Sequence, residues 1–582
     1  MNVAYSFTTR LIVVSLLAGL GLTCGVKAQT CTSAAVGSQI KEPLDLRSEN
    51  GALSVELHFQ SETGADGQQL YCYVYRGVAG APTLRVHPGD ELSLALYNDA
   101  EPPAANAASA VAPAHMHHSS GVSAGNCTAD ISMTAFSTNL HFHGMTIPPT
   151  CHQDDVLRTV VQPHDKPFEY KIRIPEDALP GLYWYHPHVH GFSNMQVLGG
   201  ASGAIVVEGL EKRNPLIAGL PERVLIVRDL NLLHPDAQPV ASPGVPPPLV
   251  LRDAEGDILN TGTGGGKPAK DLSLNGVAVP FPEYTPAILT VQPKKRELWR
   301  LLNACAITYL DVQLLVENRP QLLGVVALDG APLRPNARTH QPILWMTHIL
   351  LPPAGRAEFV VNGLAEGAKA SLVTRTIDTG PAGENDPTRP LAKVVVRSDA
   401  PAPLSYVSSV PFNEVPQPEP TWLGAIPAIR ERKLYFTEQP HDPKDPNSKT
   451  DFFITVEGET PKLFDPSSQV PNIVVQQGDV EDWIIENRTQ ELHAFHIHQT
   501  HFLMTEWNGI PMDEPSLRDT VNVGYWDGHS PQYPSVKLRM DFRDPNIVGT
   551  FVYHCHLLEH EDGGMMGTIR VDPAPQARRT GR

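Results

Sequence analysis

The stretch that decides the fold lies near the end of the chain and reads, from residue 549 to residue 560, Gly-Thr-Phe-Val-Tyr-His-Cys-His-Leu-Leu-Glu-His. Its apolar first half is typical of a buried strand. If that strand continues through Cys555, its side chains alternate between two faces, so His554 and His556 point one way and Cys555 points the other. His560 and Met565 follow, where a loop can fold back toward the sulfur. Two His, one Cys and a weak axial Met are the ligand set of a blue copper electron-transfer site, which leaves His554 and His556 to bind something on the opposite face.

Three further segments of the chain are rich in histidine at the same spacing. They are His141-Phe142-His143, His186-Pro187-His188 and His493-Ala494-Phe495-His496-Ile497-His498. A His-x-His pair on a strand puts both imidazoles on one face. A lone histidine is usually a hydrogen-bonded core residue. A structural role does not account for ten histidines, one cysteine and one methionine in four such segments.

Together the four segments resemble the copper signatures of the multicopper oxidases, the family of laccases, ascorbate oxidase and bacterial copper efflux oxidases. The last segment, with Leu-Leu-Glu-His-Glu and Met-Met after His-Cys-His, is especially similar to the copper efflux oxidases. The resemblance extends over nearly all of the chain after its first 28 residues. It implies a laccase-like enzyme that oxidises small reductants such as phenols and aromatic amines, one electron at a time, and reduces O2 to two waters.

The resemblance also implies four copper ions per chain and a role for each motif residue. One type 1 (blue) copper receives electrons, and one type 2 and two type 3 coppers form a trinuclear cluster that binds O2. The implied type 1 ligands are His493, Cys555, His560 and, as the weak axial ligand, Met565, with Met566 as the competing candidate. The implied type 2 ligands are His141 and His496, and the implied type 3 ligands are His143, His186, His188, His498, His554 and His556.

Two carboxylates are candidates for a proton role, because the reduction of O2 consumes protons. Glu561, directly after His560, matches the efflux oxidase pattern. Asp154 is the second candidate, since family members carry an acidic residue a little after the first His-x-His motif. Here His152 occupies the commonest spacing, and Asp154 and Asp155 follow it. The alternative for Asp154 and Glu561 is a solvated or hydrogen-bonded surface carboxylate.

Three other histidines lie close to the motifs but match no ligand position. We expect each to support a ligand or to lie on the surface. They are His152, His190 and His501.

An internal repeat predicts three related β domains. The segment 84–98 recurs at 289–303 and at 473–487, and each copy reads as a strand, a Pro or Gly turn and a second strand that ends at an asparagine. Few stretches show sustained helical periodicity, and the 55 prolines suit the edges and turns of β domains. We therefore expect an all-β fold, and the resemblance implies that each domain is a cupredoxin-like Greek-key β-sandwich.

The repeat also predicts where the chemistry lies. We place the first domain at 29–210, the second at 211–400, a Pro-rich linker at 401–429 and the third domain at 430–582. No His pair follows the second copy of the repeat, so the middle domain is expected to bind no copper. Pro187 occupies the place of Cys555 in the first domain, which is therefore expected to lack a blue copper site. The copper sites are expected in the third domain and between the first and third domains.

The first 28 residues have the features of a secretory signal peptide. Arg10 supplies the positive charge, residues 11–23 form an apolar run, and Val-Lys-Ala precedes the expected cleavage site. The run is too short to span a bilayer. We expect an exported protein, periplasmic or extracellular, with no membrane span. Cys24 leaves a lipoprotein as the alternative, although Leu22-Thr23-Cys24 is a poor lipid-attachment sequence.

The remaining cysteines suit an oxidising compartment. Cys305, in the apolar stretch 301–307, is expected to be a buried free thiol. The other four are expected to form two disulfides within the first domain, in any of three pairings. They are Cys31, Cys72, Cys127 and Cys151.

The charge and the motifs also restrict the partners and the function. A formal net charge of −18 argues against nucleic acid and anionic lipid as partners. The expected partners are O2 and a small reductant, with the protein as a monomer. The alternative function is the oxidation of Cu(I). Against it, the chain has only 11 methionines and no Met-rich helical insertion. The His-Met-His-His segment at 115–118 could recruit copper, although a solvated loop is the preferred interpretation.

Non-enzymatic functions are less consistent with the motifs. A structural relative that has lost catalysis would lack some ligands, and all twelve ligand positions are filled. An electron-transfer cupredoxin needs only the type 1 ligands. A two-domain copper nitrite reductase does not fit three repeats.

Overall fold

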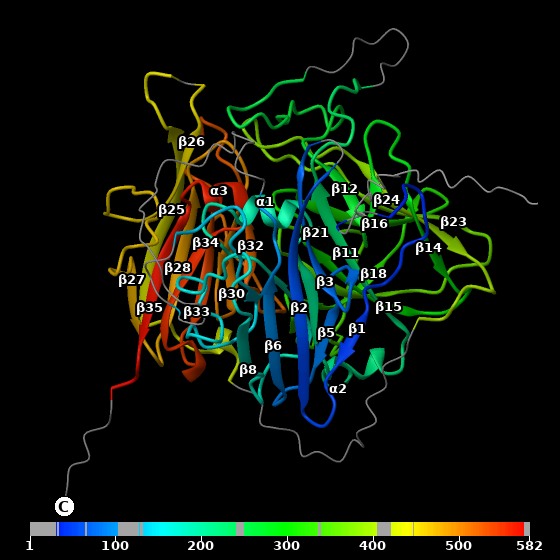
Figure 1. Cartoon of the computed structure of the whole chain (residues 1–582), viewed down its shortest axis with the longest axis horizontal. Coiled ribbons are helices and arrows are strands. Elements are labelled where there is room, and N and C mark those ends of the chain that lie inside the picture. The colour runs from blue at the N-terminus through cyan, green and yellow to red at the C-terminus, as the bar shows by residue number, and fades with distance from the viewer. Residues whose placement is uncertain are drawn as a thin grey trace, which may run out of the picture.

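The structure is a computed structural model that describes residues 31, 34–64, 67–102, 127, 132–239, 250–335, 339–403, 421–445 and 447–575. Within these residues, six β-sheets are arranged as three pairs, with three short α-helices (Figure 1). The expected all-β fold is confirmed. The predicted signal peptide, Cys24, the segment 115–118 and most of the predicted linker lie outside the described residues.

The first pair of sheets is formed by residues 45–207. One sheet has the order β1 (Asp45–Arg47), β5 (Thr83–Val86), β10 (Gly203–Val207), β9 (Gly181–His186) and β7 (His141–His143). The other has the order β4 (Val78–Ala79), β3 (Gln69–Tyr75), β2 (Ala52–Thr63), β6 (Glu91–Asn98) and β8 (Phe168–Arg173). Alternate residues of β2, from Leu53 to Phe59, are buried between the two sheets, as expected for strands with one face toward a core. The short helices α1 (Ser193–Leu198), α2 (Leu210–Arg213) and η1 (Pro215–Ile217) follow β9 and β10.

The second pair of sheets is formed by residues 222–396. One sheet has the order β13 (Val277–Val279), β12 (Asp271–Leu274), β11 (Glu222–Leu230), β15 (Glu297–Asn303), β22 (Arg356–Val361), β18 (Leu323–Leu328) and β19 (Ala331–Pro332), with β20 (Leu344–Met346) also paired to β18. The other has the order β14 (Ala287–Val291), β24 (Arg389–Val396), β23 (Lys369–Thr374), β16 (Leu310–Val316) and β17 (Arg319–Pro320), with β21 (Ile349–Leu351) on β16. Every residue of β15, β18 and β22 is buried. These strands are covered on both faces, because the first pair of sheets packs against them through Leu182 and Trp184.

The third pair of sheets is formed by residues 430–572. One sheet has the order β26 (Thr450–Val456), β25 (Arg430–Pro440), β28 (Val480–Asn487), β33 (Ser535–Asp541), β30 (Phe502–Trp507) and β31 (Ile510–Pro511). The other has the order β27 (Ile473–Gln476), β35 (Met566–Asp572), β34 (Gly549–Cys555), β29 (His493–Ile497) and β32 (Thr520–Val523). The short helices η2 (Leu423–Ala425), η3 (Pro545–Ile547) and α3 (Leu558–Asp562) lie outside the sheets.

The sequence repeat corresponds to one structural unit in each pair of sheets. Its two strands are β5 and β6, β14 and β15, or β27 and β28, and in each case the chain crosses from one sheet of the pair to the other. The asparagine at the end of each copy is buried and donates its side-chain amide to backbone carbonyls. Asn98 bonds to Phe136 and Val161, while Asn487 bonds to Glu491. A buried carbonyl needs a hydrogen-bond donor, so the asparagine side chain holds the backbone of the loop that follows each copy.

The cysteine pairing, which the sequence left open, is resolved by the structure. Cys31 bonds to Cys72, and Cys127 bonds to Cys151. Cys305 and Cys555 are buried and free. The predictions of two disulfides and of a buried free thiol at Cys305 are therefore confirmed.

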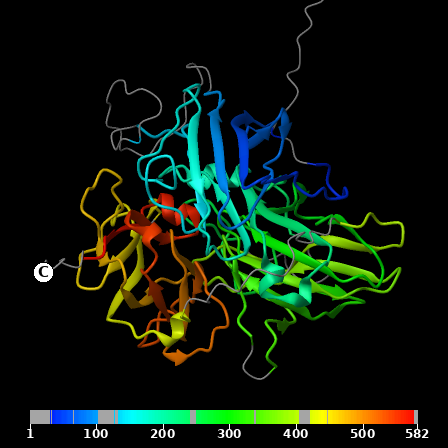
Figure 2. The ribbon, with the colours of Figure 1, turned by 90° about the horizontal axis from the view of Figure 1, so that it is seen from below.

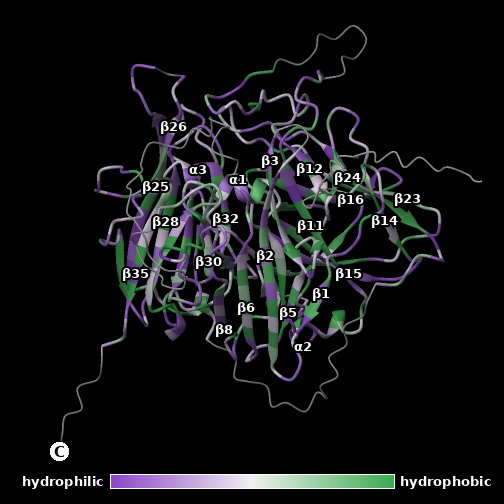
Figure 3. Cartoon of the chain, viewed as in Figure 1, coloured by the Kyte–Doolittle hydropathy of each residue, from purple (hydrophilic) through white to green (hydrophobic). Residues whose placement is uncertain are grey.

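The three pairs of sheets surround a common centre (Figure 2). Val197 of the first pair, Ala306 and Ile307 of the second and Leu558 of α3 pack into one apolar cluster there. The strands carry most of the hydrophobic colour in Figure 3, and the loops at their ends are largely hydrophilic. Among the described residues, no helix is long and apolar enough to cross a membrane.

Candidate metal centres

Strand β34 presents side chains to two different sites, as the alternation along a strand requires. The Cys555 sulfur lies 3.5 Å from His493 Nδ1 and 3.8 Å from His560 Nδ1, and these two nitrogens are 3.1 Å apart. His554 and His556 lie instead among the histidines of the other motifs. One strand therefore contributes to both sites, and the peptide bonds on either side of Cys555 join them.

The cysteine site is assembled from β29, β34 and α3. His493 begins β29, which pairs with β34 so that Phe495 lies opposite Cys555. His560 lies in α3, where the sequence predicted a loop. That prediction was wrong in detail because a five-residue helix is too short to show a 3.6-residue period. The helical turn returns the chain to the sulfur, as the predicted loop was expected to do.

The outer sides of the two imidazoles are held by hydrogen bonds and aromatic rings. Thr489 Oγ1 lies 2.9 Å from His493 Nε2, and Glu491 Oε1 lies 3.4 Å from His560 Nε2. Because the Nε2 atoms face these oxygens, the Nδ1 atoms face the sulfur. Phe452 stacks on the His560 ring at a centroid distance of 4.2 Å. The site is closed to water.

The two consecutive methionines after α3 point to different places. Met565 is fully buried in the same apolar core as Cys555, and its backbone carbonyl accepts a hydrogen bond from the Cys555 N–H at 3.1 Å. Met566 packs with Val156 and Val552 instead. Their opposite orientations follow from the extended backbone that begins at β35.

Eight buried histidines gather in a second site at the boundary between the first and third pairs of sheets. Strand pairing aligns them, since His141 lies opposite His186 and His496 lies opposite His554. Their nitrogens approach within 4.8 Å in three groups: His141 with His143 and His496, His143 with His186 and His556, and His188 with His498 and His554. Four of the eight come from each of the two pairs of sheets.

Many of these imidazoles have one nitrogen held by the protein and the other without a partner. His554 Nδ1 donates to the Cys555 carbonyl at 2.9 Å, while its Nε2 lies 3.2 Å from His498 Nε2 and 3.4 Å from His188 Nε2. His186 Nδ1 donates to the Pro187 carbonyl at 2.9 Å, and its Nε2 has no partner among the described residues. The same division occurs in His141 and His496. Among the described residues, no hydrogen-bond partner reaches His141 Nε2, His143 Nδ1, His186 Nε2 or His496 Nε2.

The electrostatics of both sites favour a bound cation. Burial lowers the pKa of His186 to about 3, of His554 to about 4 and of His560 to about 3. The imidazoles are therefore neutral, and their inward nitrogens present unshared electron pairs. Burial raises the pKa of Cys555 to about 12, so the sulfur keeps its proton until a cation replaces it. Buried polar atoms without partners are costly, and a set of imidazoles with one thiolate and one thioether fits copper.

The first candidate proton residue, Asp154, is buried against a cluster histidine. Its carboxylate lies 3.0 Å from His141 Nδ1 and accepts hydrogen bonds from the Phe142 N–H and the Gln499 amide. Burial raises the pKa of Asp154 to about 7, against the lowering effect of these two donors. The alternative of a surface carboxylate is wrong for this residue.

The second candidate, Glu561, lies between two other cluster histidines. Its Oε1 accepts a hydrogen bond from Ser193 Oγ at 2.9 Å and lies 3.7 Å from His188 Nδ1. Its Oε2 lies 3.5 Å from His554 Nδ1. Burial and the neighbouring Asp562 carboxylate raise the pKa of Glu561 well above its ordinary value. Glu561 is not a surface residue either.

The three unassigned histidines occupy different environments. His152 is exposed and donates to the Glu169 carbonyl at 2.7 Å. His501 is buried and donates to the Asp329 carbonyl at 3.0 Å. His190 faces a small cavity that adjoins the cluster.

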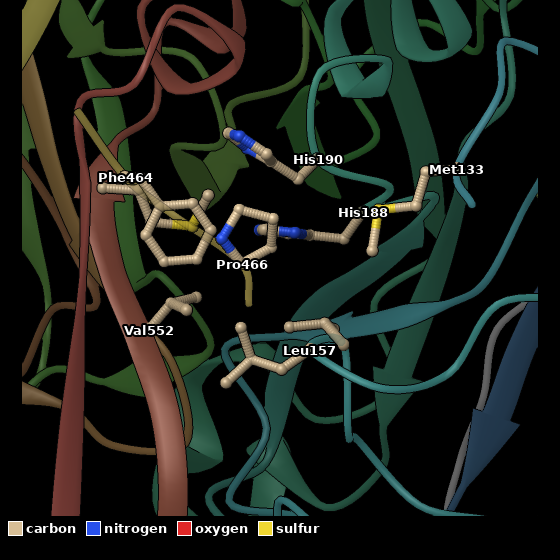
Figure 4. A pocket seen from close by; sticks show the side chains of 9 residues that line it. Met133, Leu157, His188, His190, Phe464, Pro466 and Val552 are labelled. Atoms are coloured by element: carbon tan, nitrogen blue, oxygen red, sulfur yellow. The ribbon is translucent and has the colours of Figure 1, made fainter. Parts of the chain in front are cut away.

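This cavity lies beside His188 and has a volume of about 10 Å³, which admits one water-sized molecule. His190, Phe464, Met133, Leu157 and Val552 surround it (Figure 4). Its lining is mostly apolar, so it suits a small uncharged molecule.

Sequence reasoning missed several residues that hold the ligand candidates in place. Gln499 directly follows His498 and could have been suspected from its position. Asp519 contacts the cluster and Arg356 binds Asp519, both from segments without any motif, and no local signal identifies them. Glu491 was overlooked although it lies only two residues before His493.

The fold and the two sites define an all-β oxidoreductase with copper-type ligand sets, and comparisons with known proteins agree. Residues 132–212 and 436–575 each match a family model described as multicopper oxidase. A multicopper oxidase (mco) of Staphylococcus haemolyticus is 24% identical over 505 residues, which cover 85% of this chain and 83% of that protein. A laccase of Bacillus subtilis is 21% identical, covering 69% of this chain and 72% of that protein.

Similarity to solved structures supports the same fold. A multicopper oxidase from Campylobacter jejuni, described as a metallo-oxidase, superposes with a TM-score of 0.59 at 21% identity. The match covers 92% of this chain and 96% of that one. The chain belongs to the multicopper oxidase family, whose members are oxidoreductases that use O2.

Proposed function

We propose that this protein is a laccase-like oxidase that holds four coppers. It takes electrons singly from a small reductant at the cysteine site and reduces O2 to water at the histidine cluster. The observation that carries this proposal is the shared strand, in which Cys555 faces one site while His554 and His556 face the other. A covalent path of a few bonds through the backbone thus joins an electron entry site to a site with room for several metal ions.

The ligand assignment follows the two sets of side chains. His493, Cys555 and His560 would hold the type 1 copper, with Met565 as the weak axial ligand. His141 and His496 would hold the type 2 copper, and the type 3 ligands would be His143, His186, His188, His498, His554 and His556. Three observations support the assignment: the convergence of the histidines and Cys555, the burial of all these side chains, and the ring nitrogens of several histidines that have no partner among the described residues.

Copper, when bound, supplies one-electron redox change at the first site and binding and reduction of O2 at the second. The protein supplies orientation and a closed environment. Phe452 covers His560, and Thr489 holds the outer nitrogen of His493, so the Nδ1 atoms cannot turn away from the sulfur. The apolar cavity beside His188 has room for one water-sized molecule next to the cluster.

Two carboxylates would hold the protons that the reaction consumes. Asp154 is placed at His141 Nδ1 and is connected to Gln499. Glu561 is placed between His188 and His554 and is connected to Ser193 Oγ. They lie next to histidines of the cluster, within reach of groups that can pass on a proton.

Phenols and aromatic amines remain the proposed substrates, and metal-ion oxidation is the second candidate. The names of the relatives include both a laccase and a metallo-oxidase. We further propose that the chain is exported, acts as a monomer, and has domains at 29–210, 211–400 and 430–582, with a linker at 401–429.

A copper count combined with turnover measurements tests this function. Protein loaded with copper should hold four ions per chain, show the blue absorption of a thiolate–copper bond and consume one O2 for every four electrons, without releasing peroxide. Oxidation of a phenol and of Cu(I) should be compared side by side. A loaded protein that lacks the blue band, or one that releases peroxide in proportion to the O2 consumed, would disprove the proposal.

A further inference from the structure

Asp519 contacts histidines that come from both halves of the cluster. Its carboxylate Oδ1 lies 3.2 Å from His143 Nε2, in the first pair of sheets. Its backbone carbonyl accepts a hydrogen bond from His496 Nδ1 at 2.8 Å, in the third pair. The two rings are stacked, with centroids 3.9 Å apart. Asp519 itself is completely buried.

These contacts determine which nitrogen of each ring faces the cluster. His143 donates through Nε2 and therefore leaves Nδ1 free, whereas His496 donates through Nδ1 and leaves Nε2 free. The two free atoms have no hydrogen-bond partner among the described residues. A neutral imidazole carries one proton, so the bond made by one nitrogen selects the tautomer and leaves an electron pair on the other.

Arg356 binds Asp519 and belongs to the middle pair of sheets. This pair of sheets contributes none of the proposed ligands. It lies at the start of β22, and its Nη1 and Nη2 atoms bind the two carboxylate oxygens of Asp519 at 2.8 and 2.5 Å. Its Nε donates to the Leu182 carbonyl of β9 at 3.2 Å. One fully buried side chain therefore contacts all three pairs of sheets. Bidentate pairing fixes the plane of a carboxylate as well as its position.

A glycine makes room for this ion pair directly beside the cluster. Gly144 follows His143 and has a φ of +82°. A Cβ atom there would lie 2.4 Å from Asp519 Oδ2 and 2.5 Å from Arg356 Nη2. The backbone after the first motif thus admits the pair only because residue 144 has no side chain.

We propose that Arg356 and Asp519 are positioning residues that set the metal-binding nitrogens of His143 and His496 and lock the cluster to the middle pair of sheets. The inference rests on the proposed function, because it assumes that the histidine cluster holds copper. The proposal gives the middle pair of sheets, which supplies no ligand, a direct role in the metal centre. Among the described residues, neither Arg356 nor Asp519 forms a hydrogen bond or ion pair with His493, Cys555 or His560, so the blue copper provides an internal reference.

The experiment compares Asp519→Asn, Arg356→Met and Arg356→Lys with the wild-type protein, all loaded with copper. The measurements are copper per chain, blue absorbance, the EPR signal of the type 2 copper and the resistance of cluster copper to a chelator. We expect Asp519→Asn and Arg356→Met to hold cluster copper about 10–100-fold more weakly, the effect typical of lost partners of metal ligands. The type 2 EPR signal should change while the blue absorbance stays. Arg356→Lys should recover part of the affinity, because it restores the charge without the bidentate geometry.

Arg223→Met is the matched control. Arg223 is also buried in the middle pair of sheets and binds Glu297 with two hydrogen bonds, at 2.7 and 3.1 Å, but it contacts no cluster residue. It should leave the copper affinity and the EPR signal unchanged. Wild-type copper retention and EPR signal in Asp519→Asn and Arg356→Met would overturn the inference, as would equal losses in Arg223→Met. Failure of the proposed function would appear in the wild-type protein, as a blue site without cluster copper.

Discussion

The first and third pairs of sheets contain two copies of the same local structure, and only one of them has a cysteine. Tyr185-His186-Pro187-His188 spans the end of β9, which stops at His186, and Tyr553-His554-Cys555-His556 spans the end of β34, which stops at Cys555. In each copy the first histidine donates its Nδ1 proton to the carbonyl of the next residue at 2.9 Å. A glycine faces the tyrosine from the neighbouring strand, Gly203 in one copy and Gly567 in the other.

Each copy continues into a short helix, and the two helices lie side by side (Figure 1). Asp562, at the end of α3, accepts hydrogen bonds from the backbone N–H groups of Ser193 and Asn194 at the start of α1, at 3.1 and 2.8 Å. The two copies are therefore joined at the point where their histidines meet.

The copies differ on the face that points away from the cluster. Counting from the shared histidines, the positions of His493 and Cys555 are occupied in the first copy by Thr138 and Pro187. The same backbone thus supports a cluster face in both copies and a second metal face in only one. The backbone differs only beyond the histidine pairs, where 18 positions separate Tyr185 from Gly203 and 14 separate Tyr553 from Gly567.

The largest effect is expected from exchanging the residues that distinguish the copies. Cys555→Ser should abolish the blue colour and nearly all oxidase activity, because the thiolate gives the colour and electrons enter through the sulfur. Pro187→Cys should produce no second blue site, since Thr138, in the place of His493, offers no imidazole. Visible absorption and O2 uptake test both variants. Blue colour in Cys555→Ser would remove Cys555 from the metal site.

Equivalent positions on the cluster face should give equivalent defects. His141→Ala and His496→Ala should each deplete type 2 copper and stop O2 reduction, because these two residues are the proposed type 2 ligands. The type 1 copper should still be reduced by substrate. Stopped-flow absorption should show bleaching of the blue band without recovery in air, and normal reoxidation in either variant would refute the ligand assignment.

The contact between the copies should contribute to stability. Asp562→Ala removes two hydrogen bonds to a carboxylate and should destabilise the metal-free protein by about 1.5–3 kcal/mol. Asp572→Ala is the control, because among the described residues the Asp572 side chain pairs only with the exposed Arg570, so its loss should have an effect near zero. Thermal unfolding of both variants measures the difference. Equal midpoints would show that the helices are held together by their apolar contact alone.

The smallest effect is expected from the weakest ligand. Met565→Leu should keep the blue band and raise the reduction potential of the type 1 copper by on the order of 100 mV, which for one electron is about 2.3 kcal/mol. Met566→Leu should change the potential much less, because Met566 packs with Val156 and Val552. Redox titration decides between them. A larger shift in Met566→Leu would mean that the axial ligand is misassigned by one residue.

Much of this architecture was predictable because strand periodicity is local. The positions of His554, Cys555 and His556 determine which faces they occupy as soon as the segment is extended. The repeat that ends at Asn98, Asn303 and Asn487 predicted three β units. The helical turn at His560 was missed, since it is shorter than any helical pattern that a sequence can show.

The sequence by itself determined the strand faces, the three repeats and the two sets of candidate ligands, because these depend on the spacing of residues that are close along the chain. Only the tertiary structure decided the disulfide pairing, the burial of Asp154 and Glu561, and the contact of Arg356 with Asp519 across 163 residues. The physical reason is that residues in different sheets meet only when those sheets pack together. Their separation along the chain carries no information about that contact.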